Sequence, residues 1–151
     1  MSKIFLLAMF FTTTWCSAQK SSKPEIADAM LVSIWNEKTQ EFDKLSFEKD
    51  LYIPIYFLSD RIRIILKDDK KGNQKDDKMD FYTRGKSVAK TEGNIMITEW
   101  DCKDKLGRNC SVGVLFGKEP PFTTIVAVTY SKSMQFCYWL KEKKDYKRLS
   151  Q

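Results

Sequence analysis

Histidine is absent from the whole chain, and this absence excludes several classes of enzyme. Without imidazole there is no Ser-His-Asp or Cys-His nucleophile, no histidine general base and no histidine-ligated zinc. Glycine is scarce, with 6 residues, and none of them belongs to a Gly-rich phosphate-binding loop. The 4 cysteines include no Cys-x-x-Cys redox motif. The sequence therefore predicts a protein that is not an enzyme and that uses no metal or cofactor.

Carboxylates are the remaining candidates for catalysis, because a pair of acids hydrolyses glycosides without histidine. Glu99 and Asp101 share one face of an expected strand, and Asp104 lies nearby. The oxygens of Asp101, Asp104 and Asn109 do not have the spacing of a calcium-binding loop. Acids at these positions are also typical of the solvent side of a hairpin. An acid-only hydrolase is therefore the least favoured function.

The opening residues predict export. Lys3 precedes the apolar run 4–11, and a small-residue end follows at Ser17-Ala18. We expect cleavage after Ala18, at an end that resembles the cleavage sites of exported proteins of some Gram-negative bacteria. Lipidation of Cys16 is the alternative, although bulky Trp15 precedes it. The run is too short to span a bilayer, so we expect a periplasmic or secreted protein without a transmembrane segment.

Without the first 18 residues, roughly 130 residues remain, which suits one domain with its own core. A hydrophobic content of 42% and a charged content of 30% exclude a disordered chain and a membrane-embedded one. The sequence predicts four segments in order. They are a signal peptide over 1–18, an N-terminal lead over 19–28, a single β domain over 29–141 and a basic tail over 142–151.

The net charge of +6 is mild and spread along the chain. Acids alternate with lysines through 69–78, as in the solvated tip of a hairpin, so we expect no nucleic-acid partner. An acidic glycan or an acidic protein remains a possible partner, because a basic surface attracts anions.

Alternation of apolar and polar residues with a period of two predicts strands throughout the mature chain. Residues 61–67 show it most clearly, with Ile62, Ile64 and Leu66 on one face. A short helical lead at Glu25 is the single possible helix. The expected strands cover 30–35, 51–57, 61–67, 79–84, 87–90, 94–102, 110–116, 122–130 and 134–140, and 39–45 is expected to form a turn and a short extended piece. This pattern predicts an all-β fold, a small antiparallel meander barrel or sandwich with at most a short N-terminal helix.

Residues 94–116 predict a hairpin with a cysteine at each side of its turn. Turn-forming residues fill 103–109, between Cys102 and Cys110. Counting by twos, Cys110 points inward with its apolar neighbours, whereas Cys137 points outward. We therefore expect a Cys102–Cys110 disulfide, which stabilises the fold by about 2 to 3 kcal/mol in the chain-entropy model. Cys137 is then left unpaired, under a neighbouring element or in a bridge between two copies.

Two expected strands are apolar on both faces and predict a partner surface. If 51–57 directs its larger apolar set inward, Tyr52, Pro54 and Tyr56 point outward, and the same logic exposes Trp139 in 134–140. Proline donates no ladder hydrogen bond, so Pro54 indicates an edge strand. Tyrosine and tryptophan commonly anchor interfaces. These four residues are the predicted surface for a protein or glycan partner, or for a homodimer, unless a neighbouring segment covers them.

The stretch Trp100 to Cys110, followed by two strands that end near Tyr138, resembles the C-terminal half of small exported bacterial β-proteins of uncharacterised function. The resemblance covers the signal and the last third of the chain and implies no activity. Lipocalin-like barrels and periplasmic lysozyme-inhibitor barrels are similar in size and disulfide use. The Gly-x-Trp start of the lipocalins is missing, however, and a basic chain is poorly matched to a cationic lysozyme. We expect a non-enzymatic binding or envelope-associated module of unknown ligand, with a small-ligand carrier barrel as the alternative.

Overall fold

The computed structural model describes residues 23–66, 77–119 and 123–141, and these residues form strands and turns without a helix. The predicted signal peptide, the tail 142–151 and most of the charged tip 69–78 lie outside these ranges. The ten strands are β1 (Glu25–Asn36), β2 (Glu41–Glu48), β3 (Ile53–Phe57), β4 (Arg61–Leu66), β5 (Asp77–Thr83), β6 (Val88–Glu92), β7 (Ile95–Asp104), β8 (Asn109–Gly117), β9 (Thr124–Tyr130) and β10 (Met134–Leu140). Since β1 begins at Glu25, no helical lead forms there.

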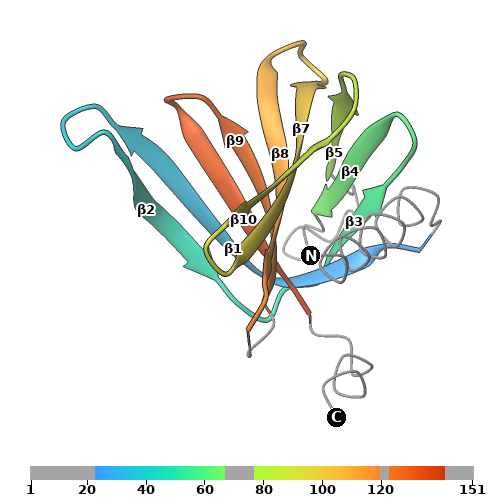
Figure 1. The fold of residues 1–151 in the computed structure, drawn as a ribbon, viewed down its shortest axis with the longest axis horizontal. Helices are drawn as coiled ribbons and strands as arrows, with labels where there is room; N and C mark the ends of the chain where they lie inside the picture. The colour runs from blue at the N-terminus through green and yellow to red at the C-terminus, as the bar shows by residue number, and fades with distance from the viewer. Residues whose placement is uncertain (1–22, 67–76, 120–122, 142–151) are drawn as a thin grey trace, which may run out of the picture.

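Eight of the strands close into an antiparallel barrel (Figure 1). Around the barrel their order is β1, β3, β4, β5, β7, β8, β9 and β10, and β10 pairs back onto β1. The all-β prediction is confirmed, and of its two forms the structure is a barrel. No helix long and apolar enough to cross a membrane is found among the described residues.

Two long strands each pair with two partners along one edge. The first residues of β1 pair with β3 through Ala27↔Ile53, and its later residues pair with β2 through Trp35↔Phe42. Likewise, β7 pairs with β5 near Asp104 and with β6 over Ile95 to Glu99. The β1–β2 hairpin therefore projects away from the group formed by β3, β4 and β5 (Figure 1).

Local sequence explains the tight connections. Gly93 lies in the two-residue turn between β6 and β7 with φ at 56°, and Gly107 lies in the β7–β8 turn with φ at 78°. Both values fall in the left-handed region that glycine adopts without a Cβ clash. In the β1–β2 turn, Asn36 stabilises the reversal of the chain, because its Oδ1 accepts a hydrogen bond of 2.9 Å from the Lys38 N–H.

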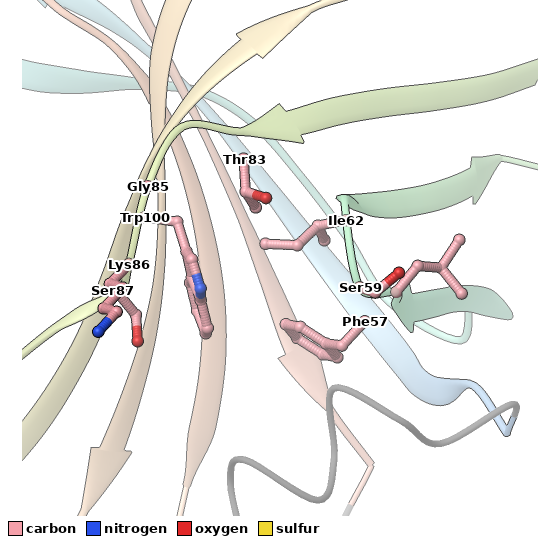
Figure 2. Close-up of a pocket in the computed structure, with 9 residues that line it drawn as sticks. Phe57, Ser59, Ile62, Thr83, Gly85, Lys86, Ser87 and Trp100 are labelled. Atoms are coloured by element: carbon pink, nitrogen blue, oxygen red, sulfur yellow. The ribbon is translucent and has the colours of Figure 1, made fainter.

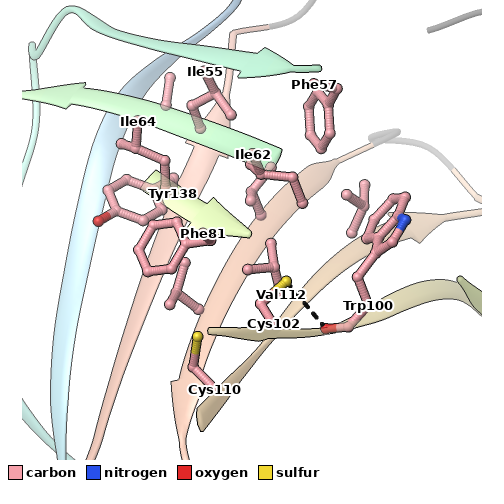
Figure 3. Packing of buried hydrophobic residues seen from close by; sticks show 14 of the residues in the cluster. Ile55, Phe57, Ile62, Ile64, Phe81, Trp100, Cys102, Cys110, Val112 and Tyr138 are labelled. Atoms are coloured by element: carbon pink, nitrogen blue, oxygen red, sulfur yellow. Dashed lines mark hydrogen bonds between the residues drawn. The ribbon is translucent and has the colours of Figure 1, made fainter. Parts of the chain in front are cut away.

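Side chains that alternate along the strands fill the middle of the barrel (Figure 3). The inward residues of β4 and β8 are Ile62, Ile64, Val112 and Val114, and each is at most 2% exposed. Tyr138 from β10 is fully buried among them. The cluster also includes Ala27, Ile53, Ile55, Phe57, Phe81, Trp100, Cys102, Cys110, Val126 and Val128. The inward face predicted for 61–67 is therefore confirmed.

The edge-strand prediction for residues 51–57 is wrong. Pro54 is buried and pairs with Ile26 of β1, while β3 pairs with β4 from Ile55 onward. Pro54 thus sits where β3 has β1 as a neighbour and just before the ladder with β4 begins. Pro54, which has no backbone N–H, is therefore accommodated where the pairing with β1 ends and the pairing with β4 begins, and not at an open edge.

Candidate ligand pocket at the barrel mouth

A pocket of about 450 Å³ opens at one end of the barrel, where the β3–β4 turn and the β5–β6 connection approach β7. It is lined by Phe57, Leu58, Ser59, Ile62, Thr83, Gly85, Lys86, Ser87 and Trp100. Its volume lies within the range of pockets that hold small molecules. The mouth pocket is therefore large enough for a ligand while the middle of the barrel is filled.

Two aromatic rings form its walls. The ring centroids of Phe57 and Trp100 lie 6.1 Å apart with their planes tilted by 40°. Figure 2 shows the two rings on opposite sides of the opening, with Ile62 between them. Both rings are less than 10% exposed, since the core packs behind them. The walls are thus held by the core and offer rigid apolar contact area.

Backbone hydrogen bonds fix the rim of the pocket. The Thr83 N–H donates to the Asp60 carbonyl at 3.0 Å and ties the end of β5 to the β3–β4 turn. The Arg84 N–H donates to the Asp101 carbonyl at 2.7 Å and ties the β5–β6 connection to β7. Gly85 follows with φ at 79°, a left-handed angle that glycine adopts without strain. These backbone hydrogen bonds therefore fix the segments that carry the polar residues of the rim.

Lys86 supplies the charge at this end. It is the one charged residue among the described ones that line the pocket, and Ser59, Thr83 and Ser87 bring hydroxyl groups to the lining. None of the described residues that line the pocket carries a carboxylate or a thiol. The chemistry of the mouth pocket is therefore that of binding, with apolar walls, hydroxyl partners and one cation.

The inner face continues past the pocket as a half-buried wall. By register, Met96 and Thr98 of β7 face the same side as buried Val114, and so do Phe116 of β8 and Thr124 of β9. Each of these four side chains is only partly covered. Among the described residues, the barrel is therefore packed in its middle and only partly covered along this part of its inner face.

The other end of the interior is closed by a polar network around Asp104. Its Oδ1 accepts from the N–H groups of Leu106 and Arg108, both at 2.9 Å, and its Oδ2 accepts from Arg108 Nε at 2.7 Å and from the Tyr130 hydroxyl at 3.0 Å. Burial acts to raise the pKa of Asp104, but these hydrogen bonds outweigh it and hold the pKa below its ordinary value. Asp104 is thus a turn-stabilising residue, while Asp101 and Glu99 point to the outer face of β7. The three acids do not converge.

Cys102 and Cys110 pair directly across the β7–β8 ladder, and both belong to the buried core. No disulfide joins the described cysteines in the structure, and the Cys102 thiol donates to the Trp100 carbonyl at 3.6 Å (Figure 3). Burial raises the pKa of Cys102 to about 12 and that of Cys110 to about 11. The predicted placement is confirmed, and the bond between them stays a prediction.

The four residues of the predicted partner surface differ in exposure. Tyr52 is 56% exposed, Tyr56 and Trp139 are half-buried, and Pro54 is buried, so Pro54 offers no surface. Trp139 packs edge-on against Phe47 of β2, with ring centroids 5.7 Å apart. Strand β2 is therefore the neighbouring element that covers Trp139.

Cys137 shares the outer face with Trp139, as its position in the strand predicts. It lies opposite Leu31 of β1 and Ala127 of β9, and burial raises the pKa of its thiol. Cys110 points into the barrel, so the wall of the barrel separates the Cys110 thiol from the Cys137 thiol.

No protein-family model, curated protein or solved structure matches the chain.

The mouth pocket was not predicted from the sequence. Phe57, Ile62 and Trp100 have the same apolar character as the core residues beside them, so no local pattern separates a pocket wall from a filled interior. Gly85 lies between the expected strands 79–84 and 87–90, and this break in the strand pattern is the signal in the sequence that could have marked the position of the pocket.

Proposed function

We propose that this protein is an exported, non-enzymatic barrel that binds a small amphipathic molecule at its mouth. The mouth pocket between Phe57 and Trp100 is the observation that carries the proposal. Eight-stranded barrels are wide enough to hold one small ligand, and ligand sites commonly lie at their mouths. Export is supported by the opening sequence pattern alone.

The geometry favours the carrier over a module that only captures other proteins. A filled interior without a mouth would leave the outer surface as the only place to bind. Here a mouth pocket is present, and Met96 and Phe116 add half-buried apolar area on the inner face of the same barrel. The packed middle limits the depth of entry, so the ligand is compact or binds end-on.

The ligand class follows from the lining. Aromatic and aliphatic walls suit a ring or an acyl chain, whereas Lys86 and the rim hydroxyls suit an anionic or hydrogen-bonding head group. We therefore propose a small amphipathic molecule, with its apolar part against Trp100 and its polar end at Lys86.

The test uses 8-anilinonaphthalene-1-sulfonate, which combines aromatic rings with one sulfonate. In a chain carrying Trp35→Phe and Trp139→Phe, the mature protein keeps Trp100 as its tryptophan, so energy transfer reports probe bound near Trp100, and a variant that blocks the rim identifies the mouth pocket. We expect saturable transfer from Trp100 at one site. Ser87→Phe fills the rim and should abolish it, whereas Lys103→Phe, on the exposed outer face of β7, should not.

Lys86→Glu separates the two parts of the proposal. It should weaken binding of the sulfonate probe roughly tenfold or more, because a charge-assisted contact is replaced by repulsion. Binding of uncharged N-phenyl-1-naphthylamine should change little. Binding that survives Ser87→Phe, or that involves no transfer from Trp100, would show that the mouth pocket is not the site.

A further inference from the structure

A second groove, of about 530 Å³, lies on the outer face of the barrel, and it shares no lining residue with the mouth pocket. Trp35 and Phe42 line one part of it, from the β1–β2 hairpin. Asp101, Ser111 and Thr129 line another part, from β7, β8 and β9. The groove is therefore built by strands that are far apart in the sequence.

The aromatic part is held by the strand register. Trp35 and Phe42 are cross-strand partners, with ring centroids 5.1 Å apart and planes at 72°. The backbone N–H of Trp35 donates to the Ser133 carbonyl at 2.8 Å, and this bond fixes the end of β1 against the β9–β10 turn. The strand register and this backbone hydrogen bond thus place both rings side by side at one part of the groove.

The polar part is a row of side chains across neighbouring strands. The ladders place Gln135, Thr129, Ser111 and Asp101 side by side on the outer face, and Gln135 Nε2 donates to Thr129 Oγ1 at 3.0 Å. The Asp101 carboxylate is exposed and forms no ion pair or hydrogen bond with another described side chain. It is free to accept hydrogen bonds from a ligand.

The indole N–H of Trp35, at the aromatic part of the groove, lacks a hydrogen-bond acceptor among the described residues. Its Nε1 atom is shut off from solvent. An unpaired buried donor destabilises the protein by about 1 to 3 kcal/mol, so such groups normally have partners. A ligand oxygen in the groove would supply the missing acceptor after a small rotation of the ring.

The combination of groups selects the ligand. Asp101 and Lys132 bring one negative and one positive charge, so the groove does not favour a strongly charged molecule. Asn109 Oδ1 already accepts from Arg84 Nη1 at 3.2 Å, which leaves its N–H groups as donors. Aromatic rings beside closely spaced donors and acceptors suit a molecule with an apolar C–H face and a hydroxylated edge. We propose that this groove binds a pyranose ring of a neutral oligosaccharide.

The test titrates the folded protein with cellohexaose, maltohexaose, xylohexaose and chitohexaose. In a chain carrying Trp100→Phe and Trp139→Phe, Trp35 is the tryptophan kept in the mature protein, so its fluorescence reports on the outer groove. We expect at least one of the four to change the Trp35 emission saturably. In the parent chain, Asp101→Asn should weaken binding of that sugar by roughly tenfold, the loss expected for a hydrogen bond to a charged group.

Trp35→Phe retains a ring but lacks the N–H, so it should weaken binding, measured by calorimetry, by roughly fivefold to tenfold. Lys103→Ala, an exposed change on the same strand as Asp101, serves as the matched control and should leave affinity unchanged. Because Asp101 is exposed, its replacement tests the site even if changes at Trp35 disturb the hairpin. The proposal is overturned if none of the four sugars binds, if Asp101→Asn has no effect, or if polygalacturonate binds while the neutral sugars do not.

Discussion

Cys102 faces Cys110 across the β7–β8 ladder, inside the barrel. Directly opposed strand residues have Cα separations that fall within the range of disulfides. We predict that these two cysteines are bonded when the protein is isolated from an oxidising compartment, as the proposed export implies, and non-reducing peptide mapping checks this. Cys137 lies on the outer face of β10, so recovery of Cys137 bonded to either of them would contradict the strand register.

The reduced protein should lose stability in base. Burial raises the pKa of Cys102 to about 12 and of Cys110 to about 11, from an ordinary value of 9.0. Raised thiol pKa values give stability that is complete below pH 9 and is lost as the pH rises toward the folded-state values. Each thiol contributes a slope of up to about 1.4 kcal/mol per pH unit. Urea unfolding between pH 8.5 and 11 should show a steeper loss for the reduced protein than for the oxidised one, and equal slopes would refute the account.

Two tyrosines should respond to the same substitution in opposite ways. The Tyr130 hydroxyl donates to Asp104, so Tyr130→Phe should lower the free energy of unfolding by about 1 kcal/mol. The Tyr138 hydroxyl is buried without a partner among the described residues, so Tyr138→Phe should leave stability unchanged or raise it by up to about 1 kcal/mol. Chemical denaturation of the two variants decides it, and a clear loss for Tyr138→Phe would reveal a hydrogen-bond partner.

Asp80 should couple stability to acid pH. Arg63 donates to both carboxylate oxygens, at 2.6 and 3.0 Å, and lowers the pKa of Asp80, which is only 4% exposed. The lowered pKa gives stability that is present above the ordinary value of 3.8 and is lost as the pH falls through the folded-state value. Asp80→Asn should therefore destabilise the protein by about 2 kcal/mol at pH 7.

The difference between Asp80→Asn and the parent protein should shrink as the pH falls below 3.8, because the parent also loses its carboxylate there. Asp60→Asn is the matched control, since Asp60 pairs with Arg61 at an exposed position and should matter little. If the difference in the free energy of unfolding between Asp80→Asn and the parent protein stays constant from pH 7 to pH 2.5, the effect comes from packing and not from the charge.

The strands themselves were predictable because each has a local signature. The alternation around Ile62 and Ile64 marks β4, and the turn formers between Cys102 and Cys110 mark the β7–β8 hairpin. In each of these strands the alternation of apolar and polar residues shows which side chains point inward. Many of the core residues can therefore be predicted from this alternation alone.

Pairing between distant strands was not predictable in this way. Pro54 was assigned to an open edge because nothing in residues 51–57 records that β1 and β4 lie on either side. Trp139 was assigned to the surface because Phe47, its covering partner, is far away in the sequence. Both candidate sites depend on such pairings, since their linings come from strands that only the closed barrel brings together.

The ladder between β1 and β10 joins residues that are 100 or more positions apart, from Ile34↔Met134 to Ala27↔Leu140. A growing chain therefore has no closed barrel until its last strand has been made. Before that point β1 and β9 are unpaired edges, which readily recruit other strands. Non-local pairing of this kind also slows folding. Closure of the barrel therefore waits for β10, the strand that covers the open edges of both β1 and β9.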